Sequence, residues 1–244
     1  MTLPIRHHKH VSAPLPALRR RVLVIGLVLL ALGVVLTVLV RVPSTASAVQ
    51  RVDDWWYDLM RDLRRAPAVS FSKVLSEVFG TAIDWPIRAL VAIVIAVRRH
   101  WLALTAWTVT VAVSEVSIGP IKALVDRPRP PGALIATSAA SYPSGHAIAS
   151  AVTAIGIVMA LTSGRRRLYW MIVAVIVAAL VALSRTYLAA HWLTDVLGGS
   201  FLGAGLALGI PEAFEVARDR RRARAGAPPP GKRVDRISPS RHRR

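Results

Sequence analysis

The sequence predicts an all-α polytopic membrane protein, a bundle of six transmembrane helices. Two observations lead to this prediction. The 244-residue chain is 54% hydrophobic and carries a net charge of +19, with a mean hydropathy of +0.47, and a soluble domain of this size is not usually so apolar and so basic at once. The two properties also separate along the chain, because apolar runs of membrane-spanning length alternate with clusters of arginine.

Each predicted span is an apolar run close to the roughly 20 residues that cross about 30 Å of hydrocarbon. The first follows three consecutive arginines, the second ends at a pair of arginines, and the fourth stops at three more. An arginine-rich segment follows the last. The six spans lie at about residues 22–40, 81–97, 101–118, 147–162, 168–183 and 194–210.

The arginine clusters also predict the orientation. With a cytoplasmic N-terminus, residues 19–21, 98–99, 165–167 and the C-terminal segment all lie in the cytoplasm, in agreement with the positive-inside rule. We therefore expect a plasma-membrane protein with both termini cytoplasmic. Its parts would be a cytoplasmic segment (1–21), a membrane domain (22–210) and a basic, disordered tail (211–244). We expect this tail to lie beside anionic lipid and not to bind nucleic acid.

Two segments near the N-terminus each allow two interpretations. Residues 50–75 mix acidic and basic residues around Trp55 and Trp56, which suits either a helix at the outer interface or a simple connector. The first span has arginines before it and Ala46-Ser47-Ala48 after it, as in a cleaved signal peptide. Its apolar run is longer than the about 7–15 residues of such a signal, so we favour an uncleaved anchor helix.

Some kinds of site are excluded or unsupported. The chain has no cysteine, so disulfides, thiolate metal sites and cysteine nucleophiles are excluded. It contains no HExxH, EF-hand or P-loop motif, so we expect no metal ion and no nucleotide cofactor.

Three short stretches hold the polar chemistry of the C-terminal half: residues 122–130, 143–146 and 184–195. In the predicted topology they follow the third span, precede the fourth and join the fifth to the sixth, so all three emerge on the outer face. Together they supply cations, histidines and a carboxylate, an inventory that suits a phosphoryl group. These residues are Lys122, Arg129, Arg185, His146, His191 and Asp195.

His191 and Asp195 are four residues apart, so on a helix they share a face. Asp195 could then orient one ring nitrogen of His191 and leave the other as a nucleophile. Arg185, six positions earlier, has a forked guanidinium suited to phosphate. The plainer alternative is a histidine at a membrane interface with a chance acidic neighbour.

The stretch 143–146 directly precedes an apolar helix. Gly145 allows a close backbone approach to an anion, the N–H groups of a helix start point toward it, and Ser144 adds a hydroxyl. His146 could protonate a leaving oxygen. The plainer alternative is a turn followed by a helix cap.

The stretch 122–130 presents Lys122 and Arg129 on a backbone stiffened by prolines. Charge alone does not decide whether Arg127 or Arg129 faces a bound anion. The plainer alternative is a basic loop near lipid headgroups.

The combination K-x6-RP, PSGH and SR-x5-H-x3-D resembles the three-part signature of the type 2 phosphatidic acid phosphatase superfamily. The resemblance implies that His191 is a nucleophile that forms a phosphohistidine, with Asp195 orienting it and His146 as the acid. It selects Arg129 over Arg127 and implies no metal ion. The phosphate-binding residues that it implies are Lys122, Arg129, Ser144, Gly145 and Arg185.

We therefore expect a membrane lipid phosphatase with an outward-facing site and a lipid phosphate or diphosphate as its substrate. Polyprenyl diphosphate is favoured, and phosphatidic acid or phosphatidylglycerol phosphate come next. The alternatives are a lipid phosphotransferase that uses the same phosphohistidine and a non-enzymatic transporter or scaffold, which would need no intact nucleophile. Within the third span, Glu115 either lines a substrate groove or pairs with Lys122, and we favour the pair.

Overall fold

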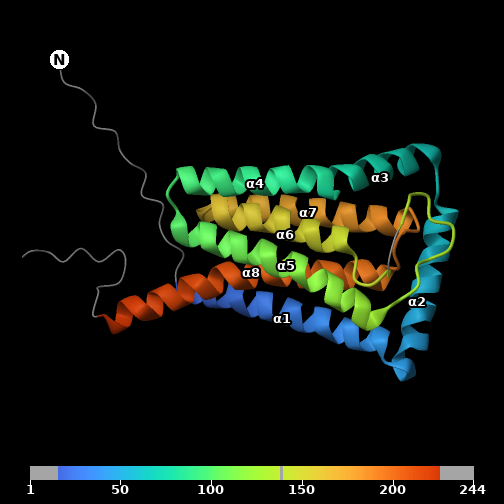
Figure 1. Ribbon diagram of the computed structural model, residues 1–244, viewed down its shortest axis with the longest axis horizontal. Coiled ribbons are helices and arrows are strands. Elements are labelled where there is room, and N and C mark those ends of the chain that lie inside the picture. Colours follow the sequence, from blue (N-terminus) through green and yellow to red (C-terminus); the bar gives the residue numbers. More distant parts are fainter. Residues whose placement is uncertain (1–15, 138–139, 226–244) are drawn as a thin grey trace, which may run out of the picture.

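The computed structural model describes residues 16–137 and 140–225, and the regular structure in these residues is entirely helical (Figure 1). The all-α prediction is therefore confirmed for this part of the chain. Its helices are α1 (Pro16–Arg41), α2 (Pro43–Asp62), α3 (Ala66–Val78), α4 (Thr81–Val97), α5 (Trp101–Val125), α6 (Gly145–Leu161), α7 (Gly164–Tyr187) and α8 (Leu193–Arg224).

Helix α8 is the centre of the bundle, and α1, α2, α5, α6 and α7 all pack against it. Glycines in α8 allow two of these helices to approach closely. A Cβ atom at Gly203 would lie 2.6 Å from the carbonyl oxygen of Ile148 in α6, and one at Gly26 of α1 would lie 2.7 Å from the backbone nitrogen of Gly209. Close backbone packing of this kind is typical of helices in membranes.

Four of the described helices are long and apolar enough to cross a membrane: α1, α5, α7 and α8. Helices α3 and α4 pass the same test only as a pair, bent by 45° at the break around Gly80. Helix α6 is apolar but shorter, because Ser144 caps it at one end and it stops before Thr162 at the other. The predicted number of six spans is therefore not confirmed by helix length and composition.

The segment 50–75, predicted to be an interfacial helix or a connector, forms most of α2 and part of α3. Figure 1 shows α2 running across one end of the bundle, almost at right angles to the long helices. It covers the end at which α5 stops and α8 begins. We call this the α2 end.

The last helix is longer than predicted, because α8 continues past the expected end at residue 210 and reaches Arg224. Ion pairs extend along this added part: Arg19 of α1, 8% exposed, pairs with Glu215, and Glu215 also pairs with Arg218. Residues 211–224 are thus helical. The predicted N-terminal segment up to residue 15 and the predicted tail from residue 226 lie outside the described residues.

Candidate active site

The three polar stretches meet at the α2 end of the bundle. Helices α5 and α7 end there, with Lys122 and Arg185 in their last turns, and α6 and α8 begin there, with Asp195 in the first turn of α8. The backbone N–H of Ser144 at the start of α6 donates to the carbonyl of Asp195 at 3.1 Å. The junctions of four helices therefore place all the residues predicted for the site in one region.

His191 and Asp195 face each other across the turn that precedes α8. The Nδ1 atom of His191 lies 3.6 Å from Oδ2 of Asp195, slightly beyond hydrogen-bond distance. The side chain of Asp195 is fully buried, and it closes the first turn of α8 by accepting the backbone N–H of Trp192 at 2.8 Å. The i, i+4 relation predicted from the sequence is thus present, although His191 itself lies in the turn ahead of the helix.

His191 is held in its neutral form. Burial lowers the pKa of its imidazole to about 4, and the nearby carboxylate of Asp195 only partly opposes this effect. The ring, 4% exposed, therefore carries no proton on one of its nitrogens at neutral pH. A buried neutral imidazole beside a carboxylate is the arrangement of a histidine that accepts an electrophile.

Arg129 is the cation nearest to the outer ring nitrogen of His191. Its Nη1 atom lies 3.3 Å from Nε2 of His191 and donates to the carbonyl of Ala190 at 2.6 Å. Lys122 and Arg129 both donate to the carbonyl of Ala140, Arg129 at 3.5 Å. Lys122 and Arg129 therefore converge on the same side of the histidine.

Arg185 completes the set of cations from α7. It is 5% exposed, it donates to the hydroxyl of Ser76 on α3, and its Nε atom has no hydrogen-bond partner among the described residues. His146, half-buried, interacts electrostatically with Arg185, His191 and Arg129. Both histidines thus lie within one cluster of positive charge.

The start of α6 is a capped helix end, as in the plainer alternative given for this stretch. Ser144 is the N-cap residue, fully buried, and its hydroxyl accepts the N–H of Ala147 at 3.4 Å. At Gly145 an added Cβ would meet only Ile118, at an ordinary contact distance of 3.9 Å. Protein packing therefore does not require glycine at this position.

The sequence analysis missed a layer of residues behind Asp195. Arg127 donates to Oδ1 of Asp195 at 2.9 Å, and Ser141 donates to Oδ2. Arg127 also pairs with Asp53 of α2 at 2.7 Å. The family resemblance selects Arg129 and not Arg127 for the phosphate site. No sequence pattern marks Asp53, which lies more than 140 positions from its α8 partner Thr194.

The predicted pair between Glu115 and Lys122 is wrong. Glu115 pairs with Arg88 of α4 at 2.6 Å, and Arg88 also pairs with Asp84 at 2.7 Å. Both Arg88 and Asp84 are buried. Arg88 outcompetes Lys122 because it approaches Glu115 from a neighbouring helix inside the bundle, whereas Lys122 lies two turns away, at the end of α5.

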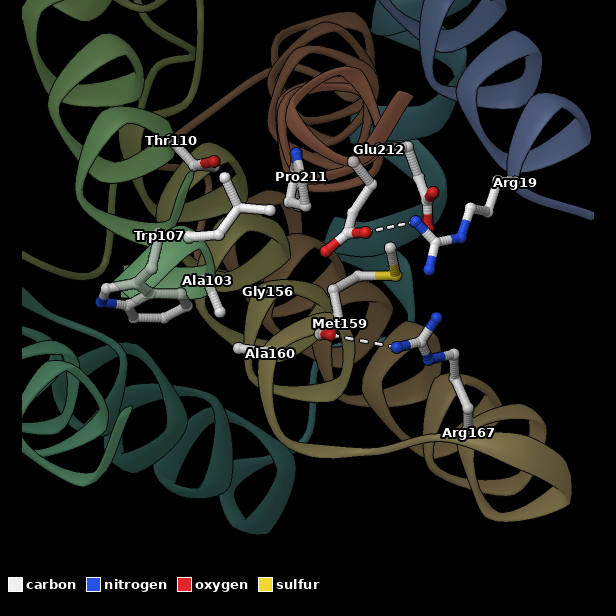
Figure 2. A pocket seen from close by; sticks show the side chains of 13 residues that line it. Arg19, Ala103, Trp107, Thr110, Gly156, Met159, Ala160, Arg167, Pro211 and Glu212 are labelled. Atoms are coloured by element: carbon white, nitrogen blue, oxygen red, sulfur yellow. Dashed lines mark hydrogen bonds and ion pairs between the residues drawn. The ribbon is translucent and has the colours of Figure 1, made fainter. Parts of the chain in front are cut away.

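A cavity of about 100 Å³ lies between α5, α6 and α8 near the opposite end of the bundle. Figure 2 shows Trp107 and Gly156 on one side of it, with Arg19, Arg167 and Glu212 on the other. None of the predicted site residues lines this cavity. Among the described residues, no group of three or more histidine, aspartate or glutamate side chains is placed to hold a metal ion.

Residues 99–219 match the family model described as the PAP2 superfamily. This stretch contains all three polar stretches of the candidate site, but no part of α1, α2, α3 or α4.

Two proteins of Bacillus subtilis are similar to this chain. Phosphatidylglycerophosphatase B of strain 168 is 40% identical over 90 residues, which cover 34% of this chain and 44% of the relative. The match thus spans less than half of that relative's length. The crystal structure of a transmembrane PAP2 type phosphatidylglycerolphosphate phosphatase has a TM-score of 0.69 at 23% identity, covering 79% of this chain and 96% of the other. The chain therefore has the fold of that membrane protein.

Proposed function

Because residues 99–219 place this chain in the PAP2 superfamily, we propose that it is an integral-membrane lipid phosphatase with its active site at the α2 end. One observation supports this proposal above the others. Three cations, Lys122, Arg129 and Arg185, gather around a buried neutral histidine that is backed by a carboxylate. Cations held close together repel one another, and a phosphate dianion offsets that repulsion.

In the proposed first step, Nε2 of His191 attacks phosphorus and the bond from phosphorus to the lipid oxygen breaks. His146, which holds its proton once the bound phosphate dianion offsets the surrounding cations, gives that proton to the departing oxygen. The lipid therefore leaves as an alcohol, or as a monophosphate when the substrate is a diphosphate. The imidazole then carries the phosphoryl group and a positive charge. Asp195, 3.6 Å from Nδ1, stabilises that charge and orients the ring.

In the second step, water attacks phosphorus and the phosphorus–nitrogen bond breaks, releasing inorganic phosphate and restoring His191. His146, now neutral, accepts a proton from the attacking water. Lys122, Arg129 and Arg185, with the backbone at Ser144 and Gly145, bind the phosphoryl oxygens in both steps. The absence of any packing reason for glycine at position 145 supports a close approach of the phosphate there.

Phosphatidylglycerol phosphate is the first candidate substrate for this chain, because both similar proteins are named as phosphatases of that lipid. Polyprenyl diphosphate, preferred on the sequence, remains the second candidate, because the phosphate-binding residues contact only the group that both lipids share. Phosphatidic acid is the third. The proposed topology has six spans, formed by α1, α3 with α4, α5, α6, α7 and α8, and an extracytoplasmic site.

The proposal is tested by phosphate release from these three lipids by the purified protein in detergent, with EDTA present, beside the variant His191→Ala. We expect release by the wild type and none by the variant, and the relative rates rank the substrates. Release that requires an added lipid acceptor would identify a phosphotransferase. Equal release by both proteins would contradict the assignment of His191.

A further inference from the structure

Helix α2 brings a buried carboxylate to the candidate active site from outside the family match. Asp53 lies in α2, far from residues 99–219 in sequence, and is fully buried. Burial of a carboxylate is costly unless its oxygens are bound by hydrogen-bond donors or cations. The partners of Asp53 therefore indicate why it is there.

Both oxygens of Asp53 are bound by residues that hold the catalytic carboxylate. Oδ1 accepts the backbone N–H of Thr194 at 2.8 Å, and Oδ2 accepts the Thr194 hydroxyl at 2.6 Å. Oδ2 also accepts from Nη2 of Arg127 at 2.7 Å. Thr194 is the residue directly before Asp195. Asp53 therefore fixes the first turn of α8 beside the residue that carries the catalytic carboxylate.

Arg127 connects the two carboxylates through the two arms of its guanidinium. Nη1 donates to Asp195 at 2.9 Å and to Thr194 at 2.8 Å, while Nη2 donates to Asp53. Arg127 is 8% exposed, and its guanidinium lies 5.4 Å from the ring of Trp192. A planar fork held on both sides in this way has little rotational freedom, so Asp195 is held as well.

The charges of this group also serve His191. One guanidinium shared between two carboxylates leaves one negative charge that Arg127 does not neutralise. Without the charge of Asp53, the positive charge of Arg127 would act on Asp195 only. Asp195 would then stabilise a positively charged His191 less.

We propose that Asp53 is a positioning residue of the active site: through Arg127 and Thr194 it holds Asp195 in place behind His191 and leaves its negative charge available to the imidazole. This inference rests on the proposed phosphatase function. It also means that the reaction depends on a helix that the three-part signature does not include.

The test compares Asp53→Asn and Arg127→Lys with the wild type, using the full chain in detergent. The probe is whichever of phosphatidylglycerol phosphate, polyprenyl diphosphate and phosphatidic acid the wild type hydrolyses fastest. Asparagine keeps the shape of Asp53 without its charge. Lysine keeps the charge of Arg127 but cannot bridge two carboxylates as a planar fork. Asp58→Asn is the matched control, because Asp58 lies on the same helix and its side chain is 56% exposed.

We expect kcat to fall about 10- to 100-fold in both variants, the size typical of losing a group that orients an active-site residue. Asp53 does not contact the phosphate-binding residues, so KM and the inhibition constant of inorganic phosphate should stay within about twofold. Asp58→Asn should match the wild type in all three quantities.

Two results would overturn the inference but leave the phosphatase function in place. The first is full kcat in both variants. The second is a loss of kcat together with equal changes in KM and in the inhibition constant of phosphate, because that pattern would indicate a loosened fold. If thermal unfolding shows that Asp53→Asn is not folded at the assay temperature, Arg127→Lys decides by the same criteria. A wild type that releases no phosphate from any of the lipids would instead overturn the proposed function, and the inference with it.

Discussion

At the scale of single residues, the candidate site separates into side chains that we propose to bind phosphate or react with it and side chains that contact those from behind. The sequence predicted that the first group lies close together. Ser144 and Asp195 stand at the starts of α6 and α8, and His191 lies in the turn ahead of α8. The sequence was insufficient for the second group. Arg127 and Asp53 meet only after α2 folds over the end of the bundle, and no local pattern encodes that contact.

The low pKa of His191 predicts how activity depends on pH. Burial lowers this pKa to about 4, so the ring stays neutral and nucleophilic until the pH falls toward that value, whereas an exposed histidine would be protonated below about 6.5. We therefore expect the acid limb of kcat/KM near pH 4, once the ionisation of the substrate phosphate is taken into account. An acid limb near 6.5 that belongs to the enzyme would show that His191 is not held neutral.

Removal of Arg129 should slow the chemical step strongly. Arg129 lies 3.3 Å from the attacking nitrogen of His191, where it would stabilise charge on the transferring phosphoryl group. We expect Arg129→Ala to lower kcat/KM about 100-fold or more, as does the loss of an oxyanion donor. Arg61→Ala, at an arginine whose side chain is 52% exposed, is the control. Near-normal turnover by Arg129→Ala would show that the phosphate is bound elsewhere.

At the scale of secondary-structure elements, the apolar runs of the sequence correspond to α1, α4, α5, α6, α7 and α8, but the details of their ends do not follow from hydropathy. Hydropathy placed the end of α8 at residue 210, yet the helix continues to Arg224, and Glu215 in this added part pairs with Arg19 on α1. The sequence does not predict α2 and α3 as helices, because a segment of mixed charge can form either an interfacial helix or a connector.

Close packing of α8 on α6 predicts the effect of one added methyl group. In Gly203→Ala the new Cβ would lie 2.6 Å from the backbone oxygen of Ile148, which cannot move aside as a side chain can. We expect a loss of about 1–3 kcal/mol of stability, measured by thermal unfolding in detergent. Gly119→Ala in α5 is the control, because nothing lies within 4 Å of its added Cβ, so its stability should be unchanged or higher.

At the scale of the whole molecule, the chain builds its candidate site from both of its halves. The family match begins at residue 99, but α1 packs along α8 and α2 supplies the carboxylate that binds Arg127. The sequence predicted that the three polar stretches emerge on one side, because two spans, the fourth and the fifth, separate the first two stretches from the third. That prediction of convergence follows from topology alone, whereas the N-terminal contribution needed the folded chain.

The proposed orientation can be measured with single cysteines, because the native chain has none. Ser47 in α2 and His100 between α4 and α5 are both exposed and lie at opposite ends of the bundle. A membrane-impermeant maleimide should label Ser47→Cys on intact cells and His100→Cys only after permeabilisation. The reverse pattern would place the site in the cytoplasm.

The central claim is that His191 carries the phosphoryl group during the reaction. In the most direct test, the protein is mixed with a lipid substrate that carries ³²P in its phosphate, and the reaction is stopped rapidly without acid. The protein is then treated with base, and its labelled peptides are mapped. The account predicts a base-stable, acid-labile label on the peptide that contains His191, absent from His191→Ala and formed before inorganic phosphate appears. Steady turnover with no such label at any time, or the same label on His191→Ala, would contradict it.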